Sequence, residues 1–352
     1  KMKIEFRTPS LVGNIYIGDD VIEKRLPDLL QGQKNFVLTD SNVYRLHRAF
    51  FEKWLQGEEI FVLPAGEEYK NFSSLQAIIE KMTGAGLRRT SRLFAVGGGV
   101  IGDIGGLCAA LYMRGIGCVQ IPTTLLSMVD SSVGGKTAID VAGVKNVVGA
   151  FYQPMEVLID TMFLSTLPER EWKCGIGEIV KYAAIDRVTF DWLNNSKNGI
   201  TKELAVSLIE NSVRYKAGVC ERDERESGER KCLNVGHTTG HAIELAYGLS
   251  HGESVLYGMK LETELAARMG VCKREYADRL LCLVDQALAL QPVSAPDFST
   301  IGLAAQKAAL DKKNTDAKNV VMSVAKDYGE WTLLSMPIDR YVNAIEDIAK
   351  NF

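Results

Sequence analysis

Three of the four histidines fall in one short stretch, LNVGHTTGHAIELAYGLSHGE, at positions 237, 241 and 251. Imidazole nitrogens are common zinc ligands, and a carboxylate often completes such a site. His237 and His241 are four residues apart, so on a helix they would share one face and could hold one metal ion. Glu178 is a further candidate ligand, because a carboxylate inside the apolar helical pattern GIGEIVKYA is costly to bury without a partner. Ordinary hydrogen-bonded histidines would explain each residue singly, but three so close together favour a metal site.

The glycine-rich sequence LFAVGGGVIGDIGG could bind a dinucleotide. Gly97, Gly99 and Gly102 stand in G-x-G-x-x-G order between a predicted strand and a predicted helix, where glycines let the backbone approach a pyrophosphate. The acidic residue expected about 20 residues later is missing, because the chain there reads QIPTT. Asp40, in LTDSNV, is therefore a better candidate for binding the ribose. A packing turn between strand and helix is the alternative interpretation.

The segment 123–146 is dense in small and polar residues, and we expect it to be long and irregular beside the sheet edge. Two glycines precede Lys136, so the backbone could surround an anion while the lysine neutralises it. A solvated loop with incidental lysines is the alternative. Arg114, at the end of the preceding helical pattern, is either an anion ligand or a helix C-cap.

The elements that must position these residues change in character along the chain. Short apolar runs alternate with helical patterns such as FSSLQAIIEKMTGAG in the first part, and they read NFVLTD (35–40), EIFVLPAG (59–66), RLFAVGGG (92–99), GCVQIPTT (117–124) and MEVLID (155–160). This alternation is typical of a parallel α/β sheet, whose ligands bind at the carboxyl ends of the strands. After about residue 160 the apolar spacing is helical, until a possible hairpin in NVVMSVAKDYGEWTLLSM. The sequence predicts an α/β Rossmann-like NAD-binding domain at residues 1–160 and a mostly α-helical metal- and substrate-binding domain at residues 161–352.

Composition narrows the range of partners. A length of 352 residues suggests two domains, and a net charge of −3 argues against a nucleic-acid partner. We expect no membrane partner, because no apolar run reaches the length of a membrane span. The seven cysteines are scattered and form no C-x-x-C pair, which argues against disulfides and thiolate zinc sites and favours a cytoplasmic location.

Several strings between residues 40 and 313 resemble one family of enzymes. They read GGGVIGD, IPTTLLSMVDSSVGGKTAID, GVKNVVGAFYQP, TLPERE, GEIVKYA, LNVGHTTGHAIE and DKK, and their order and content are similar to those of the 3-dehydroquinate synthase family of sugar-phosphate cyclases. The resemblance implies conversion of 3-deoxy-D-arabino-heptulosonate 7-phosphate to 3-dehydroquinate and phosphate, a step of the shikimate route to aromatic amino acids. The implied reaction combines transient oxidation by NAD, β-elimination of phosphate, reduction, ring opening and an intramolecular aldol. The implied cofactors are NAD and a divalent metal, most often zinc, with cobalt as the other option.

The resemblance also assigns residues, and it replaces the metal pair suggested by helical spacing. The implied metal ligands are Glu178, His237 and His251, whereas His241 moves to the substrate pocket. The implied NAD contacts are Asp40, Asn42, Glu67, Lys70, Gly98, Gly99, Val100, Asp103, Thr123, Thr124, Lys136, Lys145, Phe163 and Thr166. The implied catalytic and substrate-binding residues are Arg114, Asp130, Lys136, Asn146, Lys181, Lys216, Arg230, Asn234, His241 and one of the pair Lys312 and Lys313. Arg114 would come from the second subunit of a homodimer.

Three rival functions fit parts of the pattern. Another sugar-phosphate cyclase would use the same cofactors on a substrate without the carboxylate. A metal-dependent polyol dehydrogenase of similar fold would release NADH at each turnover. An NAD-binding sensor with a structural metal would leave the cationic residues unexplained, because such a cluster is electrostatically costly without an anionic ligand.

Overall fold

The computed structural model describes residues 2–196, 200–290, 296–309 and 318–351. Their contacts divide into two compact units, Lys1–Pro168 with Val213–Arg225, and Glu169–Ser212 with Glu226–Phe352. The sequence predicts two independent domains with a boundary between residues 160 and 161. Contacts alone do not test whether domains are independent, so this boundary stays a prediction. No helix within the described ranges is long and apolar enough to cross a membrane. All seven cysteines are free, as their scattered positions predict.

The first unit is built on a seven-stranded sheet in the order β1-β2-β9-β6-β5-β3-β4. All neighbours are parallel except the hairpin of β1 and β2. The strands are β1 (Met2–Arg7), β2 (Val12–Gly18), β3 (Asn35–Asp40), β4 (Glu59–Leu63), β5 (Arg92–Gly97), β6 (Gly117–Pro122) and β9 (Glu156–Asp160). The predicted strand 35–40 coincides with β3, and the other predicted strands lie within a few residues of those observed.

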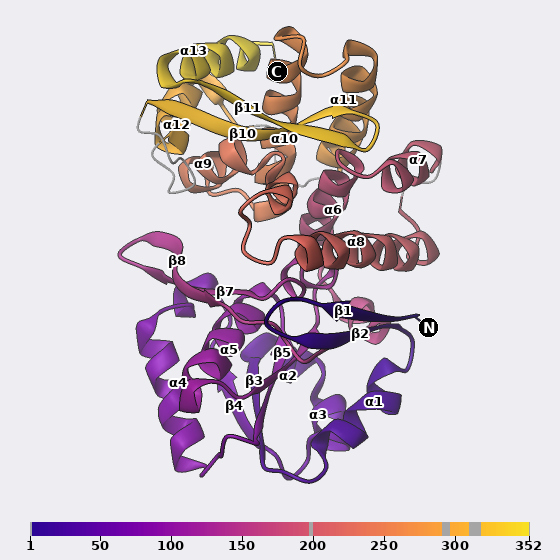
Figure 1. Cartoon of the computed structure of the whole chain (residues 1–352), viewed down its shortest axis with the longest axis vertical. Helices are drawn as coiled ribbons and strands as arrows, with labels where there is room; N and C mark the ends of the chain where they lie inside the picture. The colour runs from indigo at the N-terminus through magenta and orange to yellow at the C-terminus, as the bar shows by residue number, and fades with distance from the viewer. Residues whose placement is uncertain (1, 197–199, 291–295, 310–317, 352) are drawn as a thin grey trace. The chain divides into compact units, whose positions relative to one another are not determined.

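Helices cover both faces of this sheet (Figure 1). They are α1 (Val21–Leu30), α2 (Ser41–Leu46), α3 (Arg48–Trp54), α4 (Phe72–Gly84) and α5 (Gly99–Leu111). Buried side chains of α4 and α5, such as Ile78 and Ile104, pack on Phe36 and Leu38 of β3. This core fixes the turn between β5 and α5 at the carboxyl edge of the sheet, where the glycine-rich sequence lies.

The segment 123–146 is more regular than expected. It contains a π-helical turn at Ser127–Ser131, all of β7 (Lys136–Val141) and the start of β8 (Val144–Phe151), which pair as an antiparallel hairpin. The prediction of an irregular segment is therefore wrong. The hairpin forms for two reasons. The side chains of Thr137 and Ile139, two residues apart on β7, are both buried. Ala142 and Gly143, with φ of 52° and 74°, supply the left-handed two-residue turn that such hairpins prefer.

The second unit is mostly helical, as the apolar spacing predicts. Its helices are α6 (Glu169–Ala183), α7 (Arg187–Asn195), the first part of α8 (Lys202–Arg222), α9 (His237–Tyr247), α10 (His251–Arg268), α11 (Arg274–Ala289), α12 (Ile301–Ala309) and α13 (Ile338–Ala349). The predicted late hairpin is present as β10 (Asn319–Asp327) and β11 (Glu330–Pro337). An α/β part followed by a mainly helical part confirms the predicted fold class.

Candidate active site

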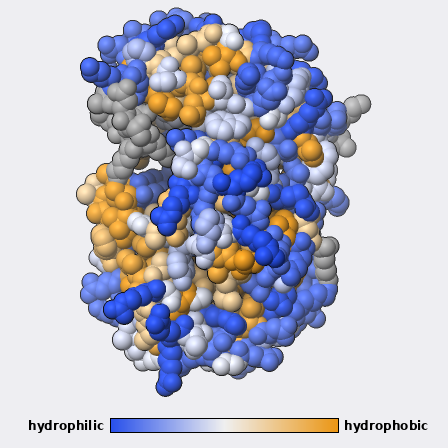
Figure 2. Space-filling view, viewed as in Figure 1, coloured by the Kyte–Doolittle hydropathy of each residue, from blue (hydrophilic) through white to orange (hydrophobic). Residues whose placement is uncertain are grey.

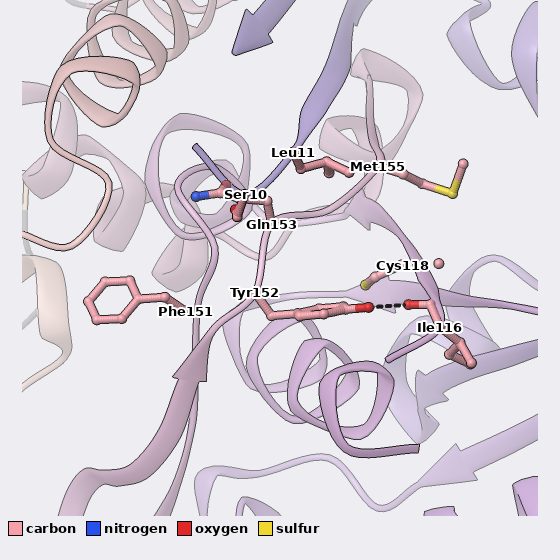
Figure 3. Close-up of a pocket in the computed structure, with 9 residues that line it drawn as sticks. Ser10, Leu11, Ile116, Cys118, Phe151, Tyr152, Gln153 and Met155 are labelled. Atoms are coloured by element: carbon pink, nitrogen blue, oxygen red, sulfur yellow. Dashed lines mark hydrogen bonds between the residues drawn. The ribbon is translucent and has the colours of Figure 1, made fainter. Parts of the chain in front are cut away.

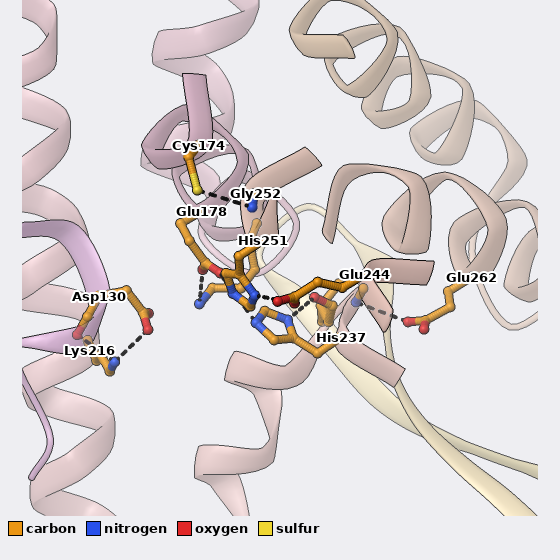
Figure 4. A network of polar contacts seen from close by, with 12 residues as sticks. Asp130, Cys174, Glu178, Lys216, His237, Glu244, His251, Gly252 and Glu262 are labelled. Carbon is orange, nitrogen blue, oxygen red and sulfur yellow. Dashed lines mark hydrogen bonds and ion pairs between the residues drawn. The ribbon is translucent and has the colours of Figure 1, made fainter. Parts of the chain in front are cut away.

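Three predicted metal ligands come together in the second unit, from three different helices (Figure 4). Nε2 of His251 lies 2.9 Å from Oε1 of Glu178, and Nε2 of His237 lies 3.3 Å from the same oxygen. Ligand atoms bound tetrahedrally to zinc at its usual bond lengths are separated by about 3.3 Å. The spacing and the donor set of one carboxylate and two imidazoles therefore fit a divalent metal with a coordination position left open.

The other nitrogen of each imidazole is already engaged. Nδ1 of His237 lies 3.0 Å from the carbonyl oxygen of Val235, and Nδ1 of His251 lies 3.0 Å from Oε2 of Glu244. A carbonyl oxygen can only accept, so Nδ1 of His237 carries the proton and Nε2 presents a lone pair. Carboxylates and carbonyls in these positions orient metal-binding histidines. Sequence reasoning missed Glu244, although its place three residues after His241 in the string GHAIE could have suggested it.

The charges of the group suit a cation site. Burial would raise the pKa of Glu178, but Lys181 and the two histidines hold it well below its usual range. Nζ of Lys181 lies 2.5 Å from Oε2 of Glu178, and both side chains are almost completely buried. Burial lowers the pKa of His237 to about 4. Burial opposes protonation of His251 too, but hydrogen bonds that the imidazole donates to Glu178 and Glu244 raise its pKa to about 10. Glu178 is thus an anion ready to bind a cation.

His241 belongs to a different group of potential ligands. It lies with Glu244 and His251, and these three residues are each only half-buried. Among the residues that the structure describes, no group of three potential ligands contains both His237 and His241. The geometry therefore groups His237 with Glu178 and His251 and not with His241, and the assignment of the metal ligands stays a prediction.

Glycines beside the ligands let the three helices approach closely. A Cβ on Gly177, next to Glu178, would lie 2.3 Å from the carbonyl oxygen of Gly252, next to His251. A Cβ on Gly258 would lie 2.0 Å from the carbonyl oxygen of Gly236, next to His237. Real Cβ atoms do not come so near a backbone oxygen, so any side chain at these positions would push the ligand-bearing helices apart.

The predicted dinucleotide turn lies in the first unit, at the end of β5. The turn joins Gly97 to the start of α5 at Gly99, and a Cβ on Gly98 would lie 3.1 Å from the side chain of Thr124. A helix N-terminus reached through a glycine turn presents unpaired N–H groups to an anion. The residues present therefore fit the pyrophosphate of a dinucleotide such as NAD. Thr123 is buried beside this turn.

A buried lysine links three of the predicted residues next to the turn. Nζ of Lys70 lies 2.7 Å from Oδ2 of Asp103 on α5 and 2.6 Å from Oδ1 of Asn146 on β8. Glu67 is a more distant partner, at 3.8 Å. Burial raises the pKa of Asp103, although Lys70 opposes that rise. Asn146 has a left-handed backbone, with φ of 53°, and its N–H donates to Asp140.

The remaining predicted cofactor residues differ in how they are placed. Oδ1 of Asp40 accepts from the N–H groups of Asn42 and Val43 and so caps α2. Phe163 is fully buried, and its phenyl ring lies against the ring of His47. The hydroxyl of Thr166 lies 2.7 Å from Nε2 of His47. Lys145 is exposed, and Val100 is partly exposed.

Two predicted substrate residues pair in the first unit. Nζ of Lys216 lies 2.9 Å from Oδ2 of Asp130 and donates to the carbonyl oxygen of the same residue. Lys136 begins β7 and is exposed. Arg114 is also exposed and follows Met113 in a strained turn, since the two have φ of 66° and 49°. Consecutive left-handed residues other than glycine are costly, and such strain gathers at functional sites.

The other predicted substrate residues belong to the second unit. Arg230 is one of the largest fully buried side chains, and Asn234 donates a hydrogen bond to Glu226. Both lie in the 3₁₀ segment Glu229–Asn234 just before α9. Lys312 and Lys313 lie outside the described residues.

A small hollow of about 180 Å³ in the first unit contains none of the predicted residues (Figure 3). Ser10, Leu11, Cys118, Phe151, Tyr152 and Met155 are among the residues that line it, and the hydroxyl of Tyr152 donates to the carbonyl oxygen of Ile116. Burial raises the pKa of Cys118 to about 12, so its thiol is unreactive. The chemistry therefore lies elsewhere.

Solved structures with the same fold define the class of protein. A 2-deoxy-scyllo-inosose synthase, solved with carbaglucose-6-phosphate, NAD⁺ and Co²⁺, is 27% identical with a TM-score of 0.85 over 98% of this chain and 100% of its own. A 2-epi-5-epi-valiolone synthase from Streptomyces hygroscopicus subsp. jinggangensis 5008, solved with NAD⁺ and Zn²⁺, is 26% identical with a TM-score of 0.82, covering 97% and 98% of the two chains. An iron-containing alcohol dehydrogenase, 14% identical with a TM-score of 0.68 over 98% of each chain, shares the fold alone. The similarity to these two cyclases in sequence and fold, over nearly the whole chain, places it in the class of sugar-phosphate cyclases.

Sequence relatives then identify the family. The family models for the N-terminal and C-terminal parts of 3-dehydroquinate synthase match residues 60–174 and 175–314. A 3-dehydroquinate synthase of Xylella fastidiosa (strain M23) is 42% identical over 308 residues, which cover 82% of this chain and 83% of the relative. One from Pseudomonas entomophila (strain L48) is 41% identical over 317 residues, which cover 86% of each. The chain belongs to the 3-dehydroquinate synthase family and is an enzyme with the lyase activity of that family.

Proposed function

We propose that this chain converts 3-deoxy-D-arabino-heptulosonate 7-phosphate to 3-dehydroquinate and phosphate, with NAD and zinc as its cofactors. The observation that carries the proposal is the group of Glu178, His237 and His251, whose spacing suits a tetrahedral metal. It is supported by the match of both family models over residues 60–314. A sugar-phosphate substrate is consistent with the related cyclase solved with carbaglucose-6-phosphate.

When bound, NAD would supply hydride acceptance and return, and the metal would supply the acidity of the hydroxyl to be oxidised. Glu178, His237 and His251 would hold the metal, and Lys181 would keep Glu178 ionised through their 2.5 Å contact. The glycine turn at Gly98–Val100, with Asp103, Lys70, Thr123 and Thr124 around it, would hold the dinucleotide. Asp40, Asn42, Glu67, Lys145 and the Phe163–Thr166 segment would complete its contacts.

The chain's cations would bind the two anionic groups of the substrate. Lys136 and Lys216 in the first unit and Lys181 and Arg230 in the second are the candidates, with Asp130, Asn146, Asn234 and His241 as polar partners. Arg230 is fully buried. A guanidinium group can bind a carboxylate or a phosphate through two parallel hydrogen bonds. This cationic set favours 3-dehydroquinate formation over cyclase reactions on substrates without a carboxylate.

We also infer a homodimer in which Arg114 enters the neighbouring site. Exposed apolar side chains gather on the β7–β8 hairpin, namely Val144, Val147, Val148 and Phe151, and Figure 2 shows hydrophobic surface in this part of the first unit. Leu111 and Met113 are also exposed; Met113 belongs to the strained turn that carries Arg114, and Leu111 lies just before it. Exposed apolar patches of this kind are typical of subunit interfaces.

The test is direct incubation of the protein with the seven-carbon keto-sugar acid phosphate, NAD and zinc. We expect release of inorganic phosphate in step with a product of the mass of 3-dehydroquinate. Substrates that lack the carboxylate should be poor by comparison. Phosphate release from the carboxylate-free sugar phosphates alone would instead assign the chain to another cyclase reaction.

A further inference from the structure

The start of α9, which carries His237, has no capping side chain of its own. Gly236 stands at the N-cap with φ of 76°, so it brings no side-chain acceptor to the first turn. The first N–H groups of a helix need an acceptor when they are buried. Thr239 is also buried, so its N–H has no access to water.

A carboxylate from α10 supplies both acceptors (Figure 4). Oε2 of Glu262 lies 3.0 Å from the N–H of Gly236, and Oε1 lies 2.7 Å from the N–H of Thr239. Glu262 is only 1% exposed. Hydrogen bonds to an ionised carboxylate are strong, and the negative charge suits the positive end of a helix.

Glu262 and His251 belong to the same helix and share a face. They are separated by eleven residues, which is about three turns. The carboxylate thus connects α10, which begins with His251, to the first turn of α9, which begins with His237. The close contact between Gly258 and Gly236 joins the same two helices. Burying a carboxylate is costly unless hydrogen bonds compensate, and the N–H groups of Gly236 and Thr239 supply such bonds here.

We propose that Glu262 is a positioning residue for the metal site, which fixes His237 relative to His251 by capping α9 from α10. This proposal rests on the proposed function, because it takes Glu178, His237 and His251 as metal ligands. It predicts that Glu262 controls metal affinity without touching the metal.

The test compares Co²⁺ binding by the full chain and by Glu262→Gln, which keeps the shape but loses the charge and one of the two acceptors. Loss of a residue that orients metal ligands typically weakens affinity about 10–100-fold, so we expect Glu262→Gln to weaken Co²⁺ binding at least about tenfold. The visible absorption bands of bound Co²⁺ should also change, because the ligand geometry changes. The matched control is Glu264→Gln on the same helix, where the carboxylate pairs with Arg268 and Arg274 in place of the N–H groups of α9.

Thermal unfolding with and without Co²⁺ separates positioning from plain stability. A tenfold weaker affinity removes about 1.4 kcal/mol of the stabilisation that the metal adds, whatever the stability of the metal-free chain. If Glu262→Gln does not fold, Glu262→Asp is measured in its place. The aspartate keeps the charge, but its side chain is too short to reach both N–H groups.

Wild-type Co²⁺ affinity in both Glu262 variants, even with a lower unfolding temperature, would overturn the positioning role. So would an equal loss of affinity in Glu264→Gln. If the wild-type chain and its Glu178→Ala variant bind Co²⁺ equally, the metal site of the proposed function is itself wrong, and the positioning role falls with it.

Discussion

Glu178→Ala and His251→Ala should each be purified without bound zinc, whereas His241→Ala should retain zinc and lose most of its activity. Each of the first two changes removes one of only three protein ligands, and two ligands do not hold zinc tightly. His241 lies outside the group of Glu178, His237 and His251, so its loss leaves that donor set complete. Elemental analysis of the purified variants measures the result.

His47→Ala is the matched control, because His47 is the remaining histidine and lies in the first unit against Phe163 and Thr166. It should keep a full complement of zinc. A zinc-free His241 variant together with a zinc-loaded His251 variant would contradict the assignment and restore the pair suggested by helical spacing.

Mixing two inactive variants, Arg114→Ala and Lys216→Ala, should restore about one quarter of the active sites, by the arithmetic of random two-fold assembly. Each variant alone should lose on the order of a hundredfold or more in activity, because each removes a charged contact to the substrate. In a hybrid dimer one site carries both lesions and the other carries none, if Arg114 serves the neighbouring site and Lys216 its own. Random exchange makes half of the dimers hybrids.

Native mass spectrometry gives the fraction of hybrids, and the activity of the mixture is compared with it. Mixing Arg114→Ala with wild type is the control, since it should give no gain beyond the wild-type share. Hybrids without recovered activity would show that Arg114 and Lys216 serve one chain's site, and a monomeric protein would remove the basis of the proposal.

Much of the first unit could be predicted because its parallel strands are short, apolar and bounded by turn residues. NFVLTD coincides with β3, and the glycine turn lies between β5 and α5 as its pattern indicates. The hairpins were harder to predict. In β7 and β8 the small and polar residues hid the alternation, since β8 exposes most of its apolar side chains. β1 and β2 also went unpredicted: β1 does alternate apolar with charged residues, but it is short, and glycines near both ends of β2 obscure its pattern.

The metal group shows the limit of local spacing. His237 and His241 are neighbours on α9, but the carboxylate beside His237 comes from Glu178 on α6 and the second imidazole from the start of α10. Only tertiary packing through Gly177, Gly252 and Gly258 brings these helices together. Glu262 could not be found from sequence for the same reason, since its partners lie at the start of another helix.

The central claim is that oxidation and reduction occur within one catalytic cycle, and the ratio of phosphate released to NAD supplied tests it most directly. With NAD limiting and substrate in large excess, we predict many phosphates released for each NAD and no rise in the absorbance of NADH. The ketone is needed only transiently to acidify the neighbouring C–H for β-elimination, so each turnover returns the cofactor to its starting state. NADH that accumulates in proportion to product would contradict the account and indicate a polyol dehydrogenase.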